Sequence, residues 1–114
     1  MAARDSVAGM PNSLIVVHVD IAVLPDRLED FLAATEANAA ASRREPGVLR
    51  FDVLADRQDP AHVVLVEVYR DEEASAAHKR TAHYATWRDT VEPMMARPRA
   101  GVRFVNVSPA DTAW

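Results

Sequence analysis

The chain has 114 residues, of which 49% are hydrophobic and 26% charged, and its formal net charge at pH 7 is −4. These values indicate one globular domain that is large enough to bury a core, and the negative charge argues against a nucleic-acid-binding protein. The absence of cysteine excludes disulfide bonds, thiolate metal ligands and a cysteine nucleophile.

Both ends of the chain are expected to lie outside the folded domain. Residues 1–12 include charged and polar residues but no apolar segment of the kind found in a secretory signal, so we predict a flexible arm there. Residues 109–114 are expected to form a tail, which leaves 13–108 as the domain. No apolar run approaches the roughly 20 residues that span a bilayer, and we expect a cytoplasmic protein that binds no membrane.

The first half of the folded region predicts one strand followed by one helix. Residues 13–24 alternate in a way that is typical of a strand. Pro25 suits the first turn of a helix, and the helix is expected to end at Glu45-Pro46-Gly47. The buried stripe of this helix is apolar first and polar later: Leu28, Phe31, Leu32, Thr35, Asn38 and Ser42.

The second half predicts two strands, two helices and a last strand. The strands cover about 48–55 and 62–70 and are joined by a turn over 56–61. Asp71 can cap a short helix over 71–79, and Thr81 can cap a longer one from about 82 to 96. A last strand is expected over 102–107.

The predicted order, β-α-β-β-α(α)-β, favours an α+β fold of the ferredoxin-like type, with a four-stranded antiparallel sheet and helices on one face. Alternation along the strands assigns ten apolar residues to the helix-covered face: Ile15, Val17, Val19, Ile21, Leu49, Phe51, Val53, Val64, Val66 and Val68. The opposite face mixes aliphatic and polar residues: Leu14, Val16, Leu54, Val63, Leu65, His18, Arg50, Asp52, Glu67 and Tyr69. Such an aliphatic area is costly in water, and two helices cannot cover both faces. We therefore predict a homodimer in which two sheets bury their second faces together.

The segment from His78 to Trp87 gathers two of the four histidines, one of the two tyrosines and one of the two tryptophans. Its spacing puts His83 and Trp87 on the core-facing stripe of the second helix. A helix junction with a half-buried histidine and a core tryptophan explains this pattern without any function. The alternative is that His78 or His83 is a general acid or base, because imidazole titrates near neutral pH. Five residues across a helix break is a poor spacing for two metal ligands, and no third ligand is obvious nearby, so we expect no metal.

Two further sets of polar residues have open alternatives. Asn38 lies on an apolar stripe, so its amide either binds the backbone or faces a cavity. Arg50 shares a sheet face with Asp52, Glu67 and Tyr69, which favours cross-strand or interface pairs. Otherwise Arg50 receives an anionic group such as a phosphate, together with Lys79 or Arg103.

Motifs in four places resemble the antibiotic biosynthesis monooxygenase family of dimeric α+β barrels. They are Glu45-Pro46-Gly47 with Arg50-Phe51-Asp52-Val53, the run from Val66 to Glu72, Ala77-His78-Lys79, and Thr81-Ala82-His83-Tyr84, within a region of resemblance over about 13–108. Arg50 to Leu54, His78-Lys79, His83-Tyr84 and Pro98-Arg99 look especially like the autoinducer-2 degradation proteins, which are isomerases of a phosphorylated hydroxy-pentanedione. The same scaffold hosts several chemistries, so the resemblance implies the fold more directly than one activity.

The resemblance leads us to expect an enzyme without a cofactor. The leading hypothesis is a monooxygenase in which a histidine deprotonates a quinol or anthrone that then reacts with dioxygen. The alternatives are an isomerase of a small phosphorylated hydroxy-dicarbonyl and a non-catalytic dimeric ligand-binding domain. The expected catalytic residues are His78, His83 and Asn38, and the expected substrate-binding residues are Tyr84, Trp87, Phe51, Arg50, Lys79 and Glu67.

Overall fold

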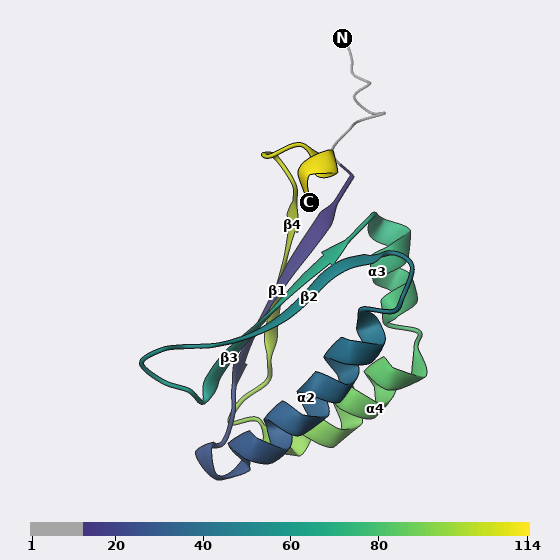
Figure 1. The fold of residues 1–114 in the computed structure, drawn as a ribbon. Coiled ribbons are helices and arrows are strands. Elements are labelled where there is room, and N and C mark those ends of the chain that lie inside the picture. The colour runs from purple at the N-terminus through teal and green to yellow at the C-terminus, as the bar shows by residue number, and fades with distance from the viewer. Residues whose placement is uncertain (1–12) are drawn as a thin grey trace.

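Three α-helices cover one face of an antiparallel sheet in the computed structural model, which describes residues 13–114 (Figure 1). The strands are β1 (Ile15–Ala22), β2 (Val48–Ala55), β3 (His62–Tyr69) and β4 (Ala100–Val105). They lie in the order β2-β3-β1-β4, and all neighbours are antiparallel. The expected ferredoxin-like α+β fold is confirmed. The arm expected at residues 1–12 lies outside the described residues.

The helices begin where the sequence predicts caps. Helix α2 spans Leu28–Ser42 after a 3-10 turn, η1, at Pro25–Arg27. Asp71 caps α3 (Glu72–His78) by accepting a hydrogen bond from Ala74 N at 2.8 Å. Thr81 caps α4 (Ala82–Val91) by accepting one from Tyr84 N at 3.2 Å. A 3-10 turn, η2 (Glu92–Met94), follows α4, so the regular helix is shorter than expected because Pro93 interrupts it.

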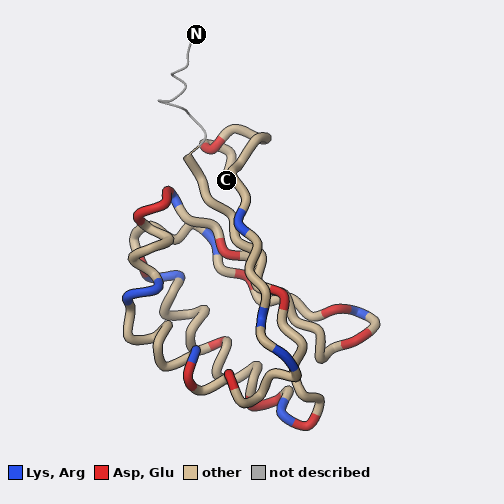
Figure 2. The backbone as a smooth tube through the Cα atoms, turned by 180° about the vertical axis from the view of Figure 1, so that it is seen from behind, with Lys and Arg blue, Asp and Glu red and all other residues tan. Residues whose placement is uncertain are grey.

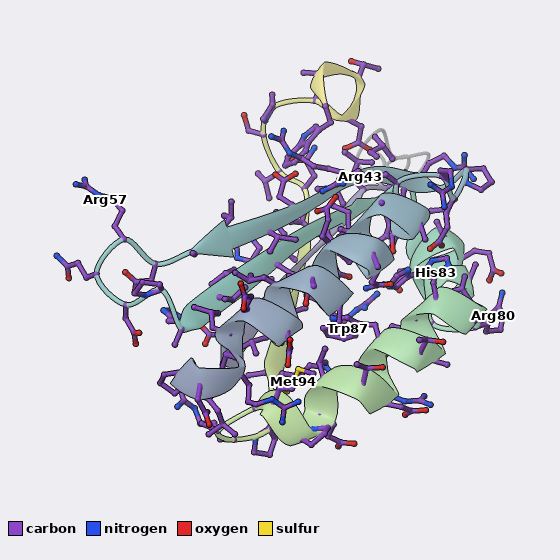
Figure 3. All side chains as sticks on the ribbon, turned by 60° about the horizontal axis from the view of Figure 1, so that its bottom comes forward. Arg43, Arg57, Arg80, His83, Trp87 and Met94 are labelled. Carbon is purple, nitrogen blue, oxygen red and sulfur yellow. The ribbon has the colours of Figure 1, made fainter. Side chains whose placement is uncertain are left out.

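The core lies between the helices and the covered face of the sheet. β1 contributes Val17, Val19 and Ile21, and the helices contribute Phe31 and Trp87 among others. Figure 3 shows Trp87 between α2 and α4, and its indole Nε1 donates to Thr35 Oγ1 at 3.0 Å. The polar stripe of α2 is therefore buried against α4.

The predicted faces of β3 were wrong by one residue. Glu67 pairs with Val17 and Leu65 with Val19, so Val63, Leu65, Glu67 and Tyr69 face the helices. Val66 and Val68 instead join Leu14 and Val16 on the outer face. β3 is apolar on both faces, so alternation alone had no basis for choosing between them. Leu49 is also exposed rather than helix-facing, because the β2–β3 register shifts between Val48 and Arg50.

The last residues fold back onto the start of β1. A 3-10 turn, η3 (Asp111–Ala113), places the Asp111 carboxylate so that it accepts hydrogen bonds from Ser13 N at 2.6 Å and from Asn106 Nδ2 at 2.7 Å. The β4 strand begins two residues earlier than expected, at Ala100. Among the described residues, no helix is long and apolar enough to cross a membrane.

Candidate active site

A pocket of about 530 Å³ lies between the α3–α4 layer and the β1–β4 side of the sheet. Its apolar wall includes Val17 and Val19 from β1 and the ring of Trp87 from α4. The polar groups of the wall come from β3, α3, α4, η2, β4 and the segments that join them: Glu67, Tyr69, Ser75, His78, Lys79, Tyr84, Glu92, Arg97, Arg99 and Arg103. A concave site with a few convergent polar groups is the usual form of a small-molecule site.

Four basic side chains line one part of this pocket. Arg103 donates to Glu72 Oε1 at 2.8 Å and to Ser75 Oγ at 3.1 Å. Arg99 donates to the Tyr84 hydroxyl at 3.1 Å, and its guanidinium lies 5.1 Å from the centre of the Trp87 ring. Figure 2, which shows the molecule from behind, has basic residues spaced along the β4 edge of the sheet. The side chains of Lys79 and Arg97 make no hydrogen bond or ion pair with other described residues, so both cations are available to an anionic ligand.

The wall formed by β3 carries a buried acid. Glu67 is 8% exposed, and the Tyr69 hydroxyl donates to its Oε1 at 2.5 Å. Burial raises the pKa of Glu67, which favours its neutral form. Burial also raises the pKa of Tyr69, so the phenol keeps its proton as a donor. These groups can donate a hydrogen bond or a proton to an oxygen in the pocket.

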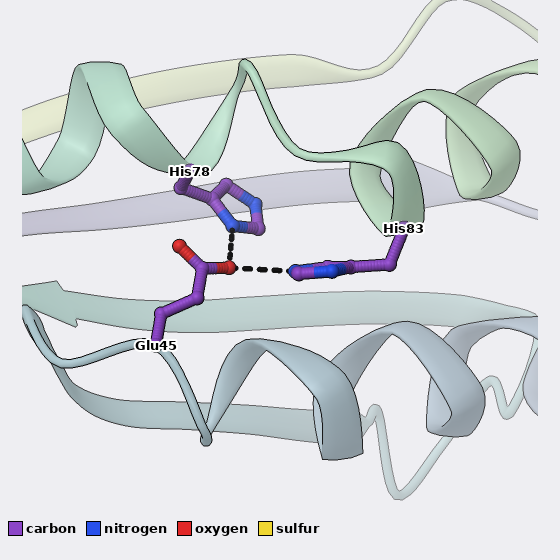
Figure 4. A group of neighbouring side chains, drawn as sticks. All are labelled: Glu45, His78 and His83. Atoms are coloured by element: carbon purple, nitrogen blue, oxygen red, sulfur yellow. Dashed lines mark hydrogen bonds and ion pairs between the residues drawn. The ribbon is translucent and has the colours of Figure 1, made fainter.

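His78 is held in one orientation by Glu45, as Figure 4 shows. Its Nδ1 lies 2.8 Å from Glu45 Oε2, and the same oxygen lies 2.6 Å from His83 Nε2. The His78 side chain is 3% exposed, and its ring packs 5.6 Å from the ring of Phe51 and 5.3 Å from that of Tyr84, measured between centres. Packing and hydrogen bonding together fix the ring.

The tautomer of His78 follows from this arrangement. An ionised carboxylate only accepts hydrogen bonds, so the nitrogen that meets Glu45 carries the hydrogen. In a neutral ring the other nitrogen, Nε2, is then bare. Since His78 lines the pocket and its Nδ1 is bound to Glu45, Nε2 is the nitrogen left to face a ligand. An oriented, bare imidazole nitrogen is suited to take a proton from a bound substrate.

Five of the expected site residues line the pocket: His78, Lys79, Tyr84, Trp87 and Glu67. Phe51 does not line it but supports the His78 ring. Arg50 lies on the opposite face of the sheet and donates to Asp52 Oδ2 at 2.6 Å, so the structure does not bring it to this pocket. Arg50 pairs with Val68, an outer-face residue, which is why it cannot reach the pocket.

The structure does not bring Asn38 or His83 to the wall of the pocket. Asn38 is on α2, which packs over β2 and α4 and so lies away from the β4 side where the pocket opens. The Asn38 amide accepts from Ser42 Oγ at 3.4 Å, and its Nδ2 has no partner among the described residues. His83, labelled in Figures 3 and 4, contacts Glu45 instead. Glu45 in turn contacts His78, which lines the pocket.

Glu45 and Arg97 were missed by the sequence analysis. Glu45 was named only at the end of a helix and in the Glu45-Pro46-Gly47 motif, without a role in the site, and it lies 33 residues from His78 in the chain. Arg97 and Arg99 flank Pro98, and this density of arginine just before the last strand was a usable signal.

The model of one protein family, described as antibiotic biosynthesis monooxygenase, matches residues 14–90. The chain belongs to this family. An isomerase of (4S)-4-hydroxy-5-phosphonooxypentane-2,3-dione from Klebsiella pneumoniae is 40% identical over 94 residues, which cover 82% of this chain and 96% of that protein. The isomerase of the same name from Salmonella paratyphi B is 43% identical, over 82% of this chain and 98% of that protein.

A solved structure from Nitrosomonas europaea, titled for the same family, has a TM-score of 0.84 and 45% identity, and covers 87% of this chain and 95% of that one. The comparisons support an enzyme, as expected. The leading expectation of a quinol or anthrone monooxygenase is contradicted, because relatives at 40–43% identity are named as isomerases. The family name is therefore no guide to the activity of this member.

Proposed function

We propose that this chain is an isomerase of a small phosphorylated hydroxy-dicarbonyl, of the class named for its relatives. The observation that carries the proposal is the pairing of an oriented base with free cations in one pocket. His78 presents Nε2 because Glu45 holds Nδ1, and Lys79 and Arg97 line the same pocket without a partner of their own. In the proposed site, His78 acts on the carbon skeleton of the substrate, and Lys79 and Arg97 bind its phosphate.

The proposed reaction moves a carbonyl to the neighbouring carbon through an enediol. In (4S)-4-hydroxy-5-phosphonooxypentane-2,3-dione, C4 bears a hydrogen and a hydroxyl beside the C3 carbonyl. His78 Nε2 takes the C4 proton, the electron pair forms the C3–C4 double bond, and the C3 oxygen becomes negative. Glu67, whose protonated form is favoured because burial raises its pKa, gives a proton to that oxygen. Return of a proton to C3 and loss of the hydroxyl proton at O4 place the carbonyl at C4, with no oxidant or reductant consumed.

The arginines bound within the protein have a different role from the free cations. Arg103 and Arg99 are held by Glu72 and by Tyr84, so they supply a fixed positive field around the phosphate. Lys79 and Arg97 lie on exposed segments and contact the phosphate directly once it is bound. Binding energy from the phosphate then positions C4 against His78.

The test follows conversion of the phosphorylated hydroxy-dione by ³¹P and ¹³C NMR in D₂O, where deuterium appears at the carbon that receives the proton. We expect His78→Asn to lower kcat by about 10²–10⁴-fold, which is the usual contribution of a general base. We expect Lys79→Met to raise KM with a smaller effect on kcat, because a phosphate contact is made in both the ground and transition states.

Arg57→Met is the matched control for Lys79→Met, since Arg57 is an exposed cation in the β2–β3 loop, far from the pocket in Figure 3. Circular dichroism of each variant checks its fold. Absence of turnover in the wild-type chain, or full turnover in folded His78→Asn, would overturn the proposal.

A further inference from the structure

Glu45, His78 and His83 form a second site on the other side of His78 from the pocket. Glu45 and His83 do not line the pocket, and they come from the loop before β2 and the first turn of α4. We propose that these three residues bind one divalent transition-metal ion, with Zn²⁺ the best match. The ion would reach the site from solvent at His83, whose side chain is 27% exposed, rather than through the pocket.

The geometry is close to that of a three-ligand metal site. Nδ1 of His78 and Nε2 of His83 lie 2.8 and 2.6 Å from Glu45 Oε2, and all three ligand atoms lie within 4.8 Å of one another. Zn²⁺ bonds to such atoms at about 2.0–2.2 Å, so ligands around it are about 3–3.5 Å apart. Figure 4 shows both rings directed at the same carboxylate oxygen. A small rotation of the two rings away from this oxygen would open room for the ion between the three ligand atoms.

The chemistry of the donors selects a class of ion. Two imidazole nitrogens and one carboxylate oxygen suit Zn²⁺ and its first-row neighbours, whereas Mg²⁺ and Ca²⁺ prefer sites made of oxygen alone. The side chains of His78 and Glu45 are 3% and 14% exposed, so both are largely shielded from competing water. The exposed side of His83 leaves a position for a water as the fourth ligand.

The site is organised before any ion arrives. Glu45 Oε2 receives both rings, and the Phe51, Tyr69 and Tyr84 rings pack around His78. The ion would replace the two ring hydrogens that point at the carboxylate. Because these side chains are already ordered, binding costs little further conformational entropy.

Binding of the ion changes the hydrogen-bonding group that His78 presents to the pocket. With Nδ1 bound to the ion, the hydrogen of the neutral ring moves to Nε2. The nitrogen that faces the ligand then donates instead of accepting. This consequence rests on the proposed isomerase function, whereas the ion site itself does not.

The test uses the full chain without a histidine tag, dialysed against EDTA and then freed of it. Titration calorimetry with Zn²⁺ should give one ion per chain, and Co²⁺ should give the visible absorption of a four-coordinate site. Glu45→Gln and His83→Gln each remove one of the three ligands, so each should weaken Zn²⁺ binding by about 100-fold or more, beyond the 10–100-fold that loss of an outer-shell partner costs. The control is His62→Gln, which removes a histidine that also lies between two carboxylates and should leave this binding unchanged.

If the folded wild-type chain binds no Zn²⁺ at about 0.1 mM, a concentration that would half fill a weak site with a Kd of the same size, the proposed ion site is overturned. Binding that persists unchanged in both folded variants would do the same. In the turnover assay, Zn²⁺ should inhibit the wild-type chain, and EDTA should restore it. If turnover is unchanged when Zn²⁺ fully occupies the site, the proposed effect on His78 is overturned. Calorimetry would still report the ion site in that case.

Discussion

His62 lies between two acids at the start of β3, well away from the pocket. Its Nδ1 is 3.0 Å from Asp56 Oδ2, and its Nε2 is 3.0 Å from Asp20 Oδ2. The hydrogen bond to Asp56, and then that to Asp20, raises the pKa of His62 above its ordinary value of 6.5. The same bond from His62 lowers the pKa of Asp56. The charged ring therefore ties the end of β1 to the loop between β2 and β3, whose acidic residues are visible in Figure 2.

The pH dependence of stability should reveal this contact. A histidine whose folded pKa is raised stabilises the fold fully below its unfolded pKa of about 6.5, and that stabilisation is lost as pH rises through the folded pKa. We expect the Tm of the wild-type chain to exceed that of His62→Gln at pH 6, and the gap to narrow by pH 9. Melting curves by circular dichroism at both pH values measure it, and a gap that is the same at both pH values would contradict the contact.

Single residues show where sequence reasoning succeeds and where it stops. His78, Lys79 and Tyr84 were predictable because they cluster within seven residues of one helix junction. Glu45 was not, since its partners lie 33 and 38 residues away and only the packing of α2 beside α4 brings them together. Asn38 shows the opposite case. Its place on the buried stripe was correct, but a buried position does not say which cavity, if any, a side chain faces.

At the scale of elements, local signals predicted boundaries well and sheet faces poorly. Asp71 and Thr81 cap the helices as expected, because a cap depends on residues three positions away. The faces of β3 depend on its pairing with β1, which the β3 sequence does not encode when both of its faces are apolar. For this reason Glu67, the acid in the pocket, was predicted on the outer face of the sheet.

The contact between the start of β2 and α3 depends on one glycine. A Cβ at Gly47 would overlap the Cβ of Ala74 on α3, and Gly47 O also accepts a hydrogen bond from Arg70 N at 2.8 Å. Gly47→Ala should therefore lower the free energy of unfolding by about 1–3 kcal/mol, as expected for overpacking. Urea unfolding followed by tryptophan fluorescence measures the change.

Gly101→Ala is the matched control, because an added Cβ there meets nothing within 4 Å. Equal stability of Gly47→Ala and the wild-type chain would show that α3 can move away from β2 without cost.

At the scale of the whole molecule, helices α2, α3 and α4 all lie on one side of the sheet and leave its outer face without a helix (Figure 1). Leu14, Val16 and Val68 are buried on that face, but its two edge strands keep apolar side chains exposed. Val102 and Phe104 on β4 are 52% and 45% exposed, and Leu54 on β2 is 49% exposed. The rings of His18 and Phe104 lie 4.9 Å apart on the same face. Exposed apolar side chains on both edge strands of one sheet face are typical of a protein–protein interface, so we propose that two copies of this chain pair through it.

Light scattering after size exclusion tests the proposed homodimer. The wild-type chain should have about twice the 12.5 kDa mass of one chain, and Phe104→Lys should shift it towards the single mass by placing a charge in the interface. Leu32→Lys is the control, because Leu32 is 37% exposed on α2, on the helix side of the sheet. A single-chain mass for the wild type at micromolar concentration would contradict the proposed pairing.

His78 connects two environments of this molecule through the two nitrogens of one ring. One ring nitrogen meets the pocket, and the other meets a carboxylate and a histidine near the outer surface of the helix layer. A chemical event at that surface, such as removal of the Glu45 charge, alters which nitrogen holds hydrogen inside the pocket without any movement of the backbone. If the proposed isomerase function holds, turnover would respond to a change at Glu45 or His83, which do not line the pocket.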